Sequence, residues 1–527
     1  MSKESKETKA NIISAAGLMS VATFISRILG YVKDMILARY FGATGVSDVF
    51  FVAFRIPNLL RELFAEGSMS SAFIPVLTDC QIKEGKDAAK KLVKSVFLIL
   101  FIILIILCFL GVIFAEQIIL LMAPGFSSNH EKLQMTVTLT RIMLPFLLFV
   151  SLSSLVMGVL NTRGIFFIPA LAPALLNIVT IICVIMLFER LTHPIISVAI
   201  GITIGGLMQF LFQLPAFYKE GYSLILPFGD FKLFNEKVKK IGKLILPSTV
   251  GMAVSQINIF VSTIFASFLK EGSITALYYS MRLIQFPIGI FGVAMSMAAL
   301  PTLSKHAAEG RIDKIAEDFS FSLKILFFIA IPSMAGLISI RDPLVNLLFQ
   351  RGLFDYEATR ATASALMYYS IGIWAIVGIR VCTSAFYSLQ DTSTPVKTAT
   401  IGIITNIIFC YILITPMGHN GLALANSLSA MTNFFIIFWL IKRKISLINV
   451  MHILKSLVKI VISALTMGVV VNYFICSTIW TTSDMFLYKS LYLSASIFIA
   501  ITIYGLMTYF LGSEEIRFFI KRIFSKA

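Results

Sequence analysis

Charged side chains stand inside apolar stretches near the start of the chain, and their types point to binding of an anion. The segment from Phe24 to Thr78 is mostly apolar, yet it contains Arg27, Lys33 and Arg61 among other charges. Each charge at the centre of a bilayer costs about 2.5–3.5 kcal/mol on insertion scales. Since a simple anchor would not carry that cost repeatedly, we expect these side chains to face a water-filled cavity. The excess of cations predicts that the cavity receives an anionic ligand.

Four cations from the two halves of the chain are the candidate ligands of a phosphate group. Arg27 and Lys33 belong to the first predicted span, Arg61 to the second and Arg282 to the eighth. A guanidinium binds phosphate oxygens in a bidentate way, whereas lysine acts as a point charge. Cations converging from both halves would suit a diphosphate. The alternative is that some of them pair with nearby carboxylates and only hold helices together.

Other charged residues nearby are candidate gates or charge partners. Asp34 would pair with the cations. Asp48 would be a counter-ion or an outer gate, or alternatively a helix N-cap after a loop that contains glycine. Glu66, which precedes a glycine, would hold the arginines in place or exchange partners during transport. Arg55 either reaches the ligand or extends to the membrane interface, and the same two alternatives apply to Lys33.

The composition predicts an all-α polytopic membrane protein. The 527 residues are 58% hydrophobic and 13% charged, whereas soluble domains are about 25% charged. Apolar runs long enough to cross a bilayer recur along the chain, and hydropathy predicts fourteen transmembrane helices. The first residues are basic and then apolar, with no cleavage site before Arg27. We therefore expect a retained segment and not a signal peptide.

The distribution of Lys and Arg sets the expected orientation. Basic clusters follow the second, sixth, eighth and twelfth predicted spans and close the chain. The positive-inside pattern places these loops and both termini in the cytoplasm. The net charge of +17 is thus typical of a multi-pass plasma-membrane protein, and no nucleic-acid partner is expected. The six cysteines show no paired or metal-like spacing, so we expect neither disulfides nor a metal site.

An internal repeat predicts the domain organisation. The early segment ILARYFGATGVSDVFFVAFRI matches the later segment IFASFLKEGSITALYYSMRL, which aligns Arg55 with Arg282. The copies begin six spans apart, which predicts two parallel six-helix lobes related by pseudo-twofold symmetry, with a central site between them and two extra C-terminal helices. The expected parts are a cytoplasmic N-terminal segment (1–10), an N-lobe (11–220), a cytoplasmic linker (221–237), a C-lobe (238–445), two lipid-groove helices (446–512) and a basic cytoplasmic tail (513–527).

Motifs of common catalytic chemistry are absent from the sequence. It contains no G-x-x-x-x-G-K-[ST], no H-E-x-x-H and no G-x-S-x-G, and its five histidines fall in or near predicted loops. We therefore expect a protein that is not an enzyme, with no catalytic residues and no cofactor. The membrane potential or an ion gradient is then the expected driving force.

Several motifs together resemble the MurJ (MviN) family of bacterial lipid II flippases. They are SRILGYVKD, SDVFFVAFRIPNLLRELFAEGSMSSAFIPV, LMAPGF, YYSMRLIQFPIGIFGVA and FYSLQDTSTPVK, and the resemblance runs through essentially the whole chain. It implies membership of the multidrug/oligosaccharidyl-lipid/polysaccharide exporter superfamily, with fourteen helices in two lobes and a lipid groove at the last two. It also implies that the essential cavity cations are Arg27, Lys33, Arg61 and Arg282, with Asp48 as the acidic residue of the second helix.

The chain departs from the family pattern in three places. Lys33 stands where the family usually has arginine, and Gln285, assigned with the gate and charge-partner residues, stands where many relatives have glutamate. Relatives that bind sodium use carboxylates on helices seven and eleven, where this chain has Ser262, Asn406 and Cys410. This last departure argues against sodium coupling.

These features together predict a flippase that moves lipid II to the outer leaflet of the bacterial plasma membrane by alternating access. Its diphosphate would bind the cationic cavity while the polyprenyl tail stays in lipid. The expected partners are lipid II, membrane lipids and other cell-wall synthesis proteins, and the expected state is a monomer. The alternatives are a transporter of another anionic polyprenyl-linked glycan, a drug/cation antiporter, for which acidic cavity residues would be typical, and a scaffold for cell-wall enzymes.

Overall fold

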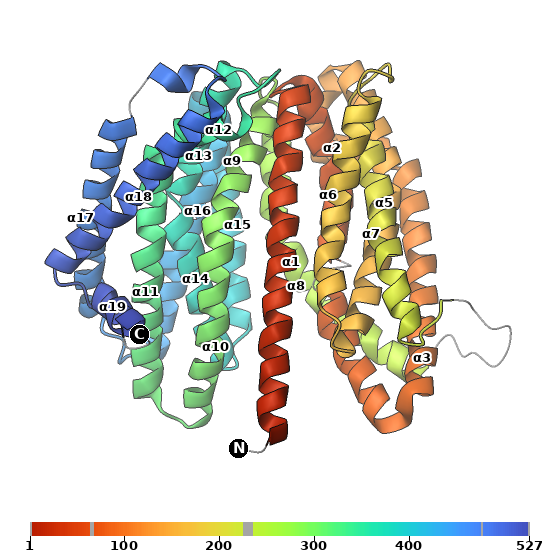
Figure 1. The fold of residues 1–527 in the computed structure, drawn as a ribbon, viewed down its shortest axis with the longest axis horizontal. Coiled ribbons are helices and arrows are strands. Elements are labelled where there is room, and N and C mark those ends of the chain that lie inside the picture. The colour runs from red at the N-terminus through yellow and green to blue at the C-terminus, as the bar shows by residue number, and fades with distance from the viewer. Residues whose placement is uncertain (1–2, 64–67, 225–234, 476–477, 525–527) are drawn as a thin grey trace. The chain divides into compact units, whose positions relative to one another are not determined.

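Every regular element is a helix in the part of the protein that the computed structural model describes, residues 3–63, 68–224, 235–475 and 478–524. It forms two compact units, Met1–Phe268 and Leu269–Ala527. The first unit contains α1 (Lys3–Phe41), α2 (Gly45–Arg61), α3 (Ser68–Ile113), α4 (Ala115–Met122), the 3-10 helix η2 (Pro124–Ser128), α5 (His130–Thr162), α6 (Phe167–Leu187), α7 (Ile196–Lys219) and α8 (Glu236–Ala266). The second contains α9 (Ser273–Pro287), the π-helical turn η3 (Ile288–Gly292), α10 (Val293–Ala308), α11 (Ile312–Ser339), α12 (Arg341–Phe349), α13 (Tyr356–Ser370), α14 (Ile373–Ser388), α15 (Ser393–Met417), α16 (His419–Lys444), α17 (Val450–Ile475), the 3-10 helix η4 (Thr478–Thr481), α18 (Phe486–Phe510) and α19 (Glu514–Phe524) (Figure 1).

Helix α5 is the centre of the first unit, because α2, α3 and α7 all pack against it. Helix α6 packs against α1 and α7, and small residues let it approach closely. A side-chain carbon on Gly201 of α7 would lie 2.8 Å from Thr180 Cα, which any larger residue would have to displace. Helix α8 packs against α3 and belongs to this unit. The lobe boundaries drawn from the sequence repeat stay a prediction.

Helix α11 has the central role in the second unit. Helices α10, α14 and α17 pack against it, and α18 packs against α17. Figure 1 shows α17 and α18, drawn in blue, beside α11. These are the two extra C-terminal helices that the sequence predicts. Helix α16 packs against α13, α14 and α15.

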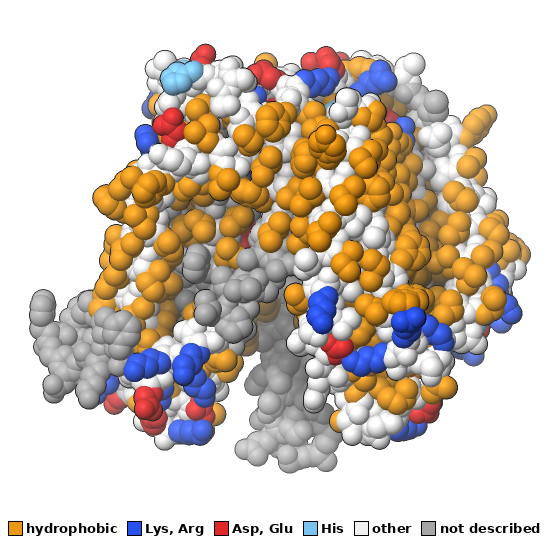
Figure 2. Space-filling view, turned by 180° about the vertical axis from the view of Figure 1, so that it is seen from behind, with side chains coloured by type: hydrophobic (Ala, Val, Ile, Leu, Met, Phe, Trp, Pro, Cys, Tyr) orange, Lys and Arg blue, Asp and Glu red, His pale blue; other side chains and the backbone are white. Residues whose placement is uncertain are grey.

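Eleven helices in the described ranges are long and apolar enough to cross a membrane. Helices α1 and α2, which carry the buried Asp34 and Asp48, and α8, with its shorter apolar segment Gln256–Ala266, are outside this set. The prediction of an all-α polytopic membrane protein is confirmed, and the count of fourteen spans is consistent with these helices. On the face drawn in Figure 2, apolar side chains cover the middle of the helices and charged ones gather toward the ends.

One basic connection is more regular than the sequence indicates. We expected a loop between the second and third spans, but α3 continues through this segment with a single interruption at Gly85. The φ of 86° at Gly85 is left-handed backbone, which glycine adopts without steric cost. Exposed ion pairs flank this turn, with Lys83 on Asp79 and Lys90 on Asp87.

Candidate functional site

The first pair of candidate charges lies on α1. The Lys33 Nζ is 3.5 Å from the Asp34 Oδ1, and the two side chains are 14% and 1% exposed. A carboxylate this deeply buried needs a cation beside it, because an unpaired buried charge is strongly destabilising. Lys33 therefore has a structural partner as well as enough exposure to meet a ligand.

Arg27 lies two turns earlier on α1 and is exposed. Its neighbour Ser26 is tied to α6, since the Asn177 Nδ2 donates to the Ser26 carbonyl oxygen at 3.3 Å. This contact fixes the backbone that carries Arg27 while the guanidinium itself stays accessible. Asn177 thus joins α6 to α1.

Arg61 ends α2 in a network of side chains that come from two helices. Its Nε donates to the Asn58 Oδ1 at 3.1 Å, and its Nη2 lies 3.8 Å from the Glu62 Oε1. The Asn58 Nδ2 in turn donates to the Glu62 Oε1 at 3.0 Å, and the Gln256 Nε2 of α8 donates to the Glu62 Oε2. Glu62 thereby joins α2 to α8 and sets the direction of the Arg61 side chain.

The other candidates near α2 have different surroundings. Asp48 is 1% exposed, and it is not the N-cap, because α2 begins at Gly45 with Thr44 in the N-cap position. The N-cap interpretation of Asp48 is therefore wrong, since the sequence signal in Ser47 and Asp48 falls one turn inside the helix. Arg55 is half-buried in the same helix. Glu66 lies outside the described residues.

The candidates of the second unit are Arg282 and Gln285. They stand three residues apart on α9, so they share one face of that helix. Arg282 is half-buried and Gln285 is exposed. Just beyond them, Pro287 ends α9 and the π-helical turn η3 joins it to α10, a local change of helix type expected where a proline interrupts the hydrogen-bond ladder.

Three further polar or charged residues, two in the network around Arg61 and one on α14 of the second unit, escaped the sequence analysis. Glu62 was visible as an intramembrane charge but received no role, and Gln256 drew no attention as a single amide in α8. Arg380 stands alone in the apolar run IWAIVGIRVC of α14 and is exposed. An ionisable residue within a membrane span is a functional candidate by default, so this isolated arginine was a usable signal.

Groups for ion coupling are few in the described part of the chain. Asp391, in the turn before α15, accepts hydrogen bonds from the Lys444 Nζ at 2.8 Å and from the Thr394 backbone N–H at 3.0 Å. These contacts hold the pKa of Asp391 well below its usual range, so it stays ionised. On α15 the Cys410 Sγ donates to the Asn406 Oδ1 at 3.0 Å, and both side chains are buried. The described residues contain no group of three potential metal ligands among His, Cys, Asp and Glu.

Comparisons with known proteins identify the family. The model of the family described as lipid II flippase MurJ matches residues 37–491. The chain is 34% identical over 511 residues to the probable lipid II flippase MurJ of Haemophilus influenzae, covering 94% of this chain and 98% of that protein.

Solved structures give the same result. A lipid II flippase MurJ in an inward closed conformation matches with a TM-score of 0.77 and 29% identity, covering 94% of this chain and 99% of that one. A multidrug MATE family transporter of the MOP superfamily, in an inward-facing conformation, shares the fold with a TM-score of 0.65 at 17% identity. The protein is therefore a multi-pass membrane protein that belongs to the MurJ family of lipid II flippases, within the MOP superfamily fold.

Proposed function

We propose that this protein flips lipid II from the inner to the outer leaflet of the bacterial plasma membrane by alternating access. It moves its substrate without changing a covalent bond and is not an enzyme. Both termini and the basic connections lie in the cytoplasm in this proposal, in accordance with the positive-inside pattern. The observation that carries the proposal is the support given to intramembrane cations: Lys33 beside buried Asp34, and Arg61 held by Asn58 and Glu62.

Arg27, Lys33, Arg61 and Arg282 bind the diphosphate in this proposal. Arginine supplies paired N–H donors that match two phosphate oxygens, and lysine adds charge without that geometry. Asp34, Asp48, Arg55, Glu66 and Gln285 act as gate or charge partners. Neutralising part of the cation charge in the empty state limits the cost of keeping these cations within the membrane.

The polyprenyl tail stays in lipid along α17 and α18. Both helices expose large apolar side chains, among them Val469 and Tyr473 on α17 and Phe498 on α18. Only the polar headgroup then has to cross the low-dielectric region. The membrane potential would assist outward movement of an anion, since one charge moved through 100 mV changes the free energy by about 2.3 kcal/mol.

The test is depletion of this protein in its host, followed by measurement of lipid II on the outer leaflet. The proposal requires outward lipid II to fall while total lipid II rises, with rescue by the wild-type chain. Arg27→Ala and Arg282→Ala, expressed at wild-type levels, should fail to rescue, whereas Lys33→Arg should succeed because it keeps the charge and adds the bidentate donor. If lipid II topology is unchanged and a different polyprenyl-linked glycan accumulates, lipid II is not the substrate. The protein would then still be a transporter, but of that other glycan.

A further inference from the structure

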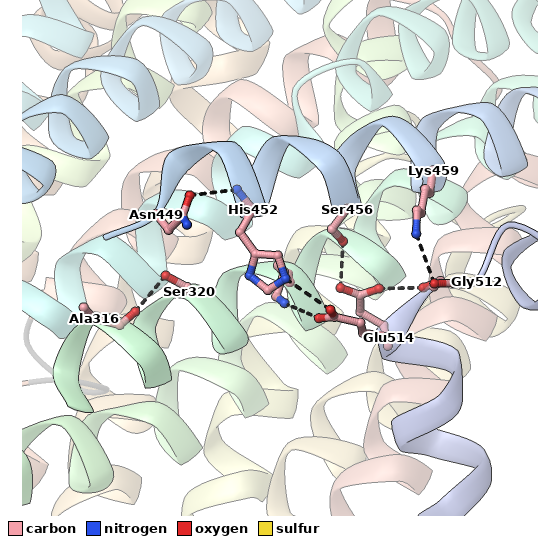
Figure 3. A network of polar contacts seen from close by, with 11 residues as sticks. Ala316, Ser320, Asn449, His452, Ser456, Lys459, Gly512 and Glu514 are labelled. Atoms are coloured by element: carbon pink, nitrogen blue, oxygen red, sulfur yellow. Dashed lines mark hydrogen bonds and ion pairs between the residues drawn. The ribbon is translucent and has the colours of Figure 1, made fainter. Parts of the chain in front are cut away.

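A cleft outside the charged network lies where α17 begins and α18 gives way to α19. It has a volume of about 470 Å³, within the range of small-molecule sites. The lining residues come from the first turns of α17 and the start of α19: Met451, His452, Leu454, Lys455, Ser456, Val458, Lys459, Ser513, Glu514 and Glu515. Figure 3 shows His452, Ser456 and Lys459 of α17 pointing toward Gly512 and Glu514.

The cations of this cleft are Lys455 and Lys459. The Lys459 Nζ donates to the Gly512 carbonyl oxygen at 3.0 Å, a neutral acceptor that leaves its charge uncompensated. Lys455 is exposed and makes no ion pair or hydrogen bond with other described residues. The four-residue spacing puts both ammonium groups on one face of α17, so they can act on the same anion.

A carboxylate stands opposite these lysines. Glu514 accepts from the Lys324 Nζ of α11 at 2.8 Å and from the His452 Nε2 at 3.2 Å, which lowers its pKa to about 2. Its side chain is nevertheless 65% exposed. Because an ionised carboxylate has about four acceptor positions, Glu514 can accept from a further donor while keeping both partners.

An exposed apolar stripe runs along α17 away from the cleft. Met451, Leu454 and Val458 line the cleft itself and are 59%, 48% and 50% exposed. Ile462 and Leu465 continue the same face of the helix and are also exposed. A molecule with a charged head in the cleft could therefore lay a hydrocarbon chain against the helix.

We propose that this cleft binds the headgroup of an aminophospholipid from the leaflet at this end of α17, which is the cytoplasmic leaflet in the orientation proposed above. The phosphate lies between Lys455 and Lys459, and the primary ammonium donates to Glu514. An acyl chain follows the apolar stripe. The cleft also contains Glu515, a 3% exposed carboxylate that accepts hydrogen bonds from Ser456 and Ser513. Two lysines together with the accessible carboxylate of Glu514 match a zwitterionic headgroup better than an anionic one, which would meet repulsion from the carboxylates.

A second cleft of about 540 Å³ shares His452 and Glu514 with the first but fits this ligand less well. Its lining adds three carboxylates, Asp313, Glu317 and Asp318, with only Lys324 as a further cation. Its lining also lacks the α17 residues that begin the apolar stripe. The phosphate is thus assigned to the first cleft.

The experiment uses the purified full-length protein with phosphatidylethanolamine, phosphatidylglycerol or phosphatidylcholine, and measures bound lipid by native mass spectrometry. Phosphatidylethanolamine should bind most tightly, because phosphatidylglycerol lacks the ammonium and the quaternary ammonium of phosphatidylcholine has no N–H donor. Replacing both lysines (Lys455→Gln with Lys459→Gln) should weaken binding about tenfold or more, since a charged hydrogen bond is lost. Lys397→Gln, an exposed lysine of α15 outside the cleft, is the matched control and should bind as the wild type.

The headgroup preference is tested by Glu514→Gln, which should reduce binding of phosphatidylethanolamine and leave that of phosphatidylglycerol unchanged or increased. If this variant unfolds because Lys324 loses its partner, binding of phosphatidylethanolamine by Lys455→Gln alone is the deciding measurement. The Lys455 side chain is exposed, so its replacement should not disturb the fold. Equal binding of the three lipids, or unchanged binding in Lys455→Gln with Lys459→Gln, would overturn the proposal.

Discussion

Gln256 of α8 donates a hydrogen bond to Glu62, which stands 194 residues earlier in the chain at the end of α2. The same carboxylate accepts from Asn58 and lies beside Arg61. A side chain on one helix thus fixes a candidate substrate-binding arginine on another. Glu62 is a positioning residue in this arrangement, because it acts through Arg61.

Removing the amide of Gln256 should disturb the position of the Arg61 side chain, although Arg61 itself is unchanged. In Gln256→Leu one oxygen of Glu62 loses its donor, and because the Glu62 side chain is 30% exposed, water replaces part of that hydrogen bond and the cost is about 1 kcal/mol. We expect lipid II flipping to fall about tenfold at wild-type expression, measured as lipid II on the outer leaflet of depleted cells. Glu62→Gln separates the two possible roles of this residue: it should retain activity if hydrogen bonding suffices and lose it if the charge is needed. Wild-type flipping in Gln256→Leu together with inactive Arg61→Ala would show that the network does not position Arg61.

The Lys33 and Asp34 pair predicts a separation of stability from function. Lys33→Met leaves a 1% exposed carboxylate without this cation, so the free energy of unfolding should fall by about 3–5 kcal/mol. The double variant Lys33→Met with Asp34→Asn should recover part of that loss, because neither charge is then buried alone. Flipping should stay low in both, since the ligand cation is absent. Stability is measured by thermal unfolding in detergent, and flipping is measured as lipid II on the outer leaflet. Recovery of flipping in the double variant would contradict a direct role for Lys33.

The pKa of Glu514, lowered to about 2 by hydrogen bonds from Lys324 and His452, predicts a loss of stability in acid. A carboxyl group whose pKa is lower in the folded state stabilises the fold above its unfolded pKa of about 4.3. That contribution disappears as the pH falls through the interval between about 4.3 and 2. The melting temperature of the wild type should therefore drop more between pH 5 and pH 3 than that of Glu514→Gln. Glu357→Gln, at an exposed carboxylate near Lys270, is the control and should follow the wild type.

Sequence and structure agree where hydropathy and charge dominate, and differ where side chains from distant segments meet. The apolar runs predict the helices because each must satisfy its own backbone in lipid. The loop expected near Lys83 is a helical segment broken only at Gly85, since hydropathy cannot distinguish a polar loop from a polar helix. The contact between Gln256 and Glu62 could not be predicted, because nothing local in either segment encodes the packing of α8. Arg380 was predictable in principle, as a lone cation in an apolar run.

Asn346 of α12 holds the connection between α17 and α18. Its Nδ2 donates to the Trp480 and Thr482 carbonyl oxygens at 2.8 Å, and its Oδ1 accepts from the Lys489 Nζ at 3.0 Å. Asn346 and Lys489 are 3% and 2% exposed, so the ammonium depends on these neutral acceptors. Asn346→Leu should lower the free energy of unfolding by about 2–3 kcal/mol, since it leaves a buried charge with one acceptor fewer.

The same contact allows a stringent check of this mechanism. If the under-solvated ammonium causes the loss, adding Lys489→Met to Asn346→Leu should restore part of the stability, although each single change is destabilising on its own. Thermal unfolding of the four proteins in one detergent gives the interaction energy between the two sites, and contacting residues typically couple by about 0.5–3 kcal/mol. Strictly additive losses would show that Asn346 stabilises the connection only through Trp480 and Thr482. Because α17 and α18 form the tail-binding side of the proposed flippase, flipping by Asn346→Leu should fall with the same temperature dependence as its unfolding.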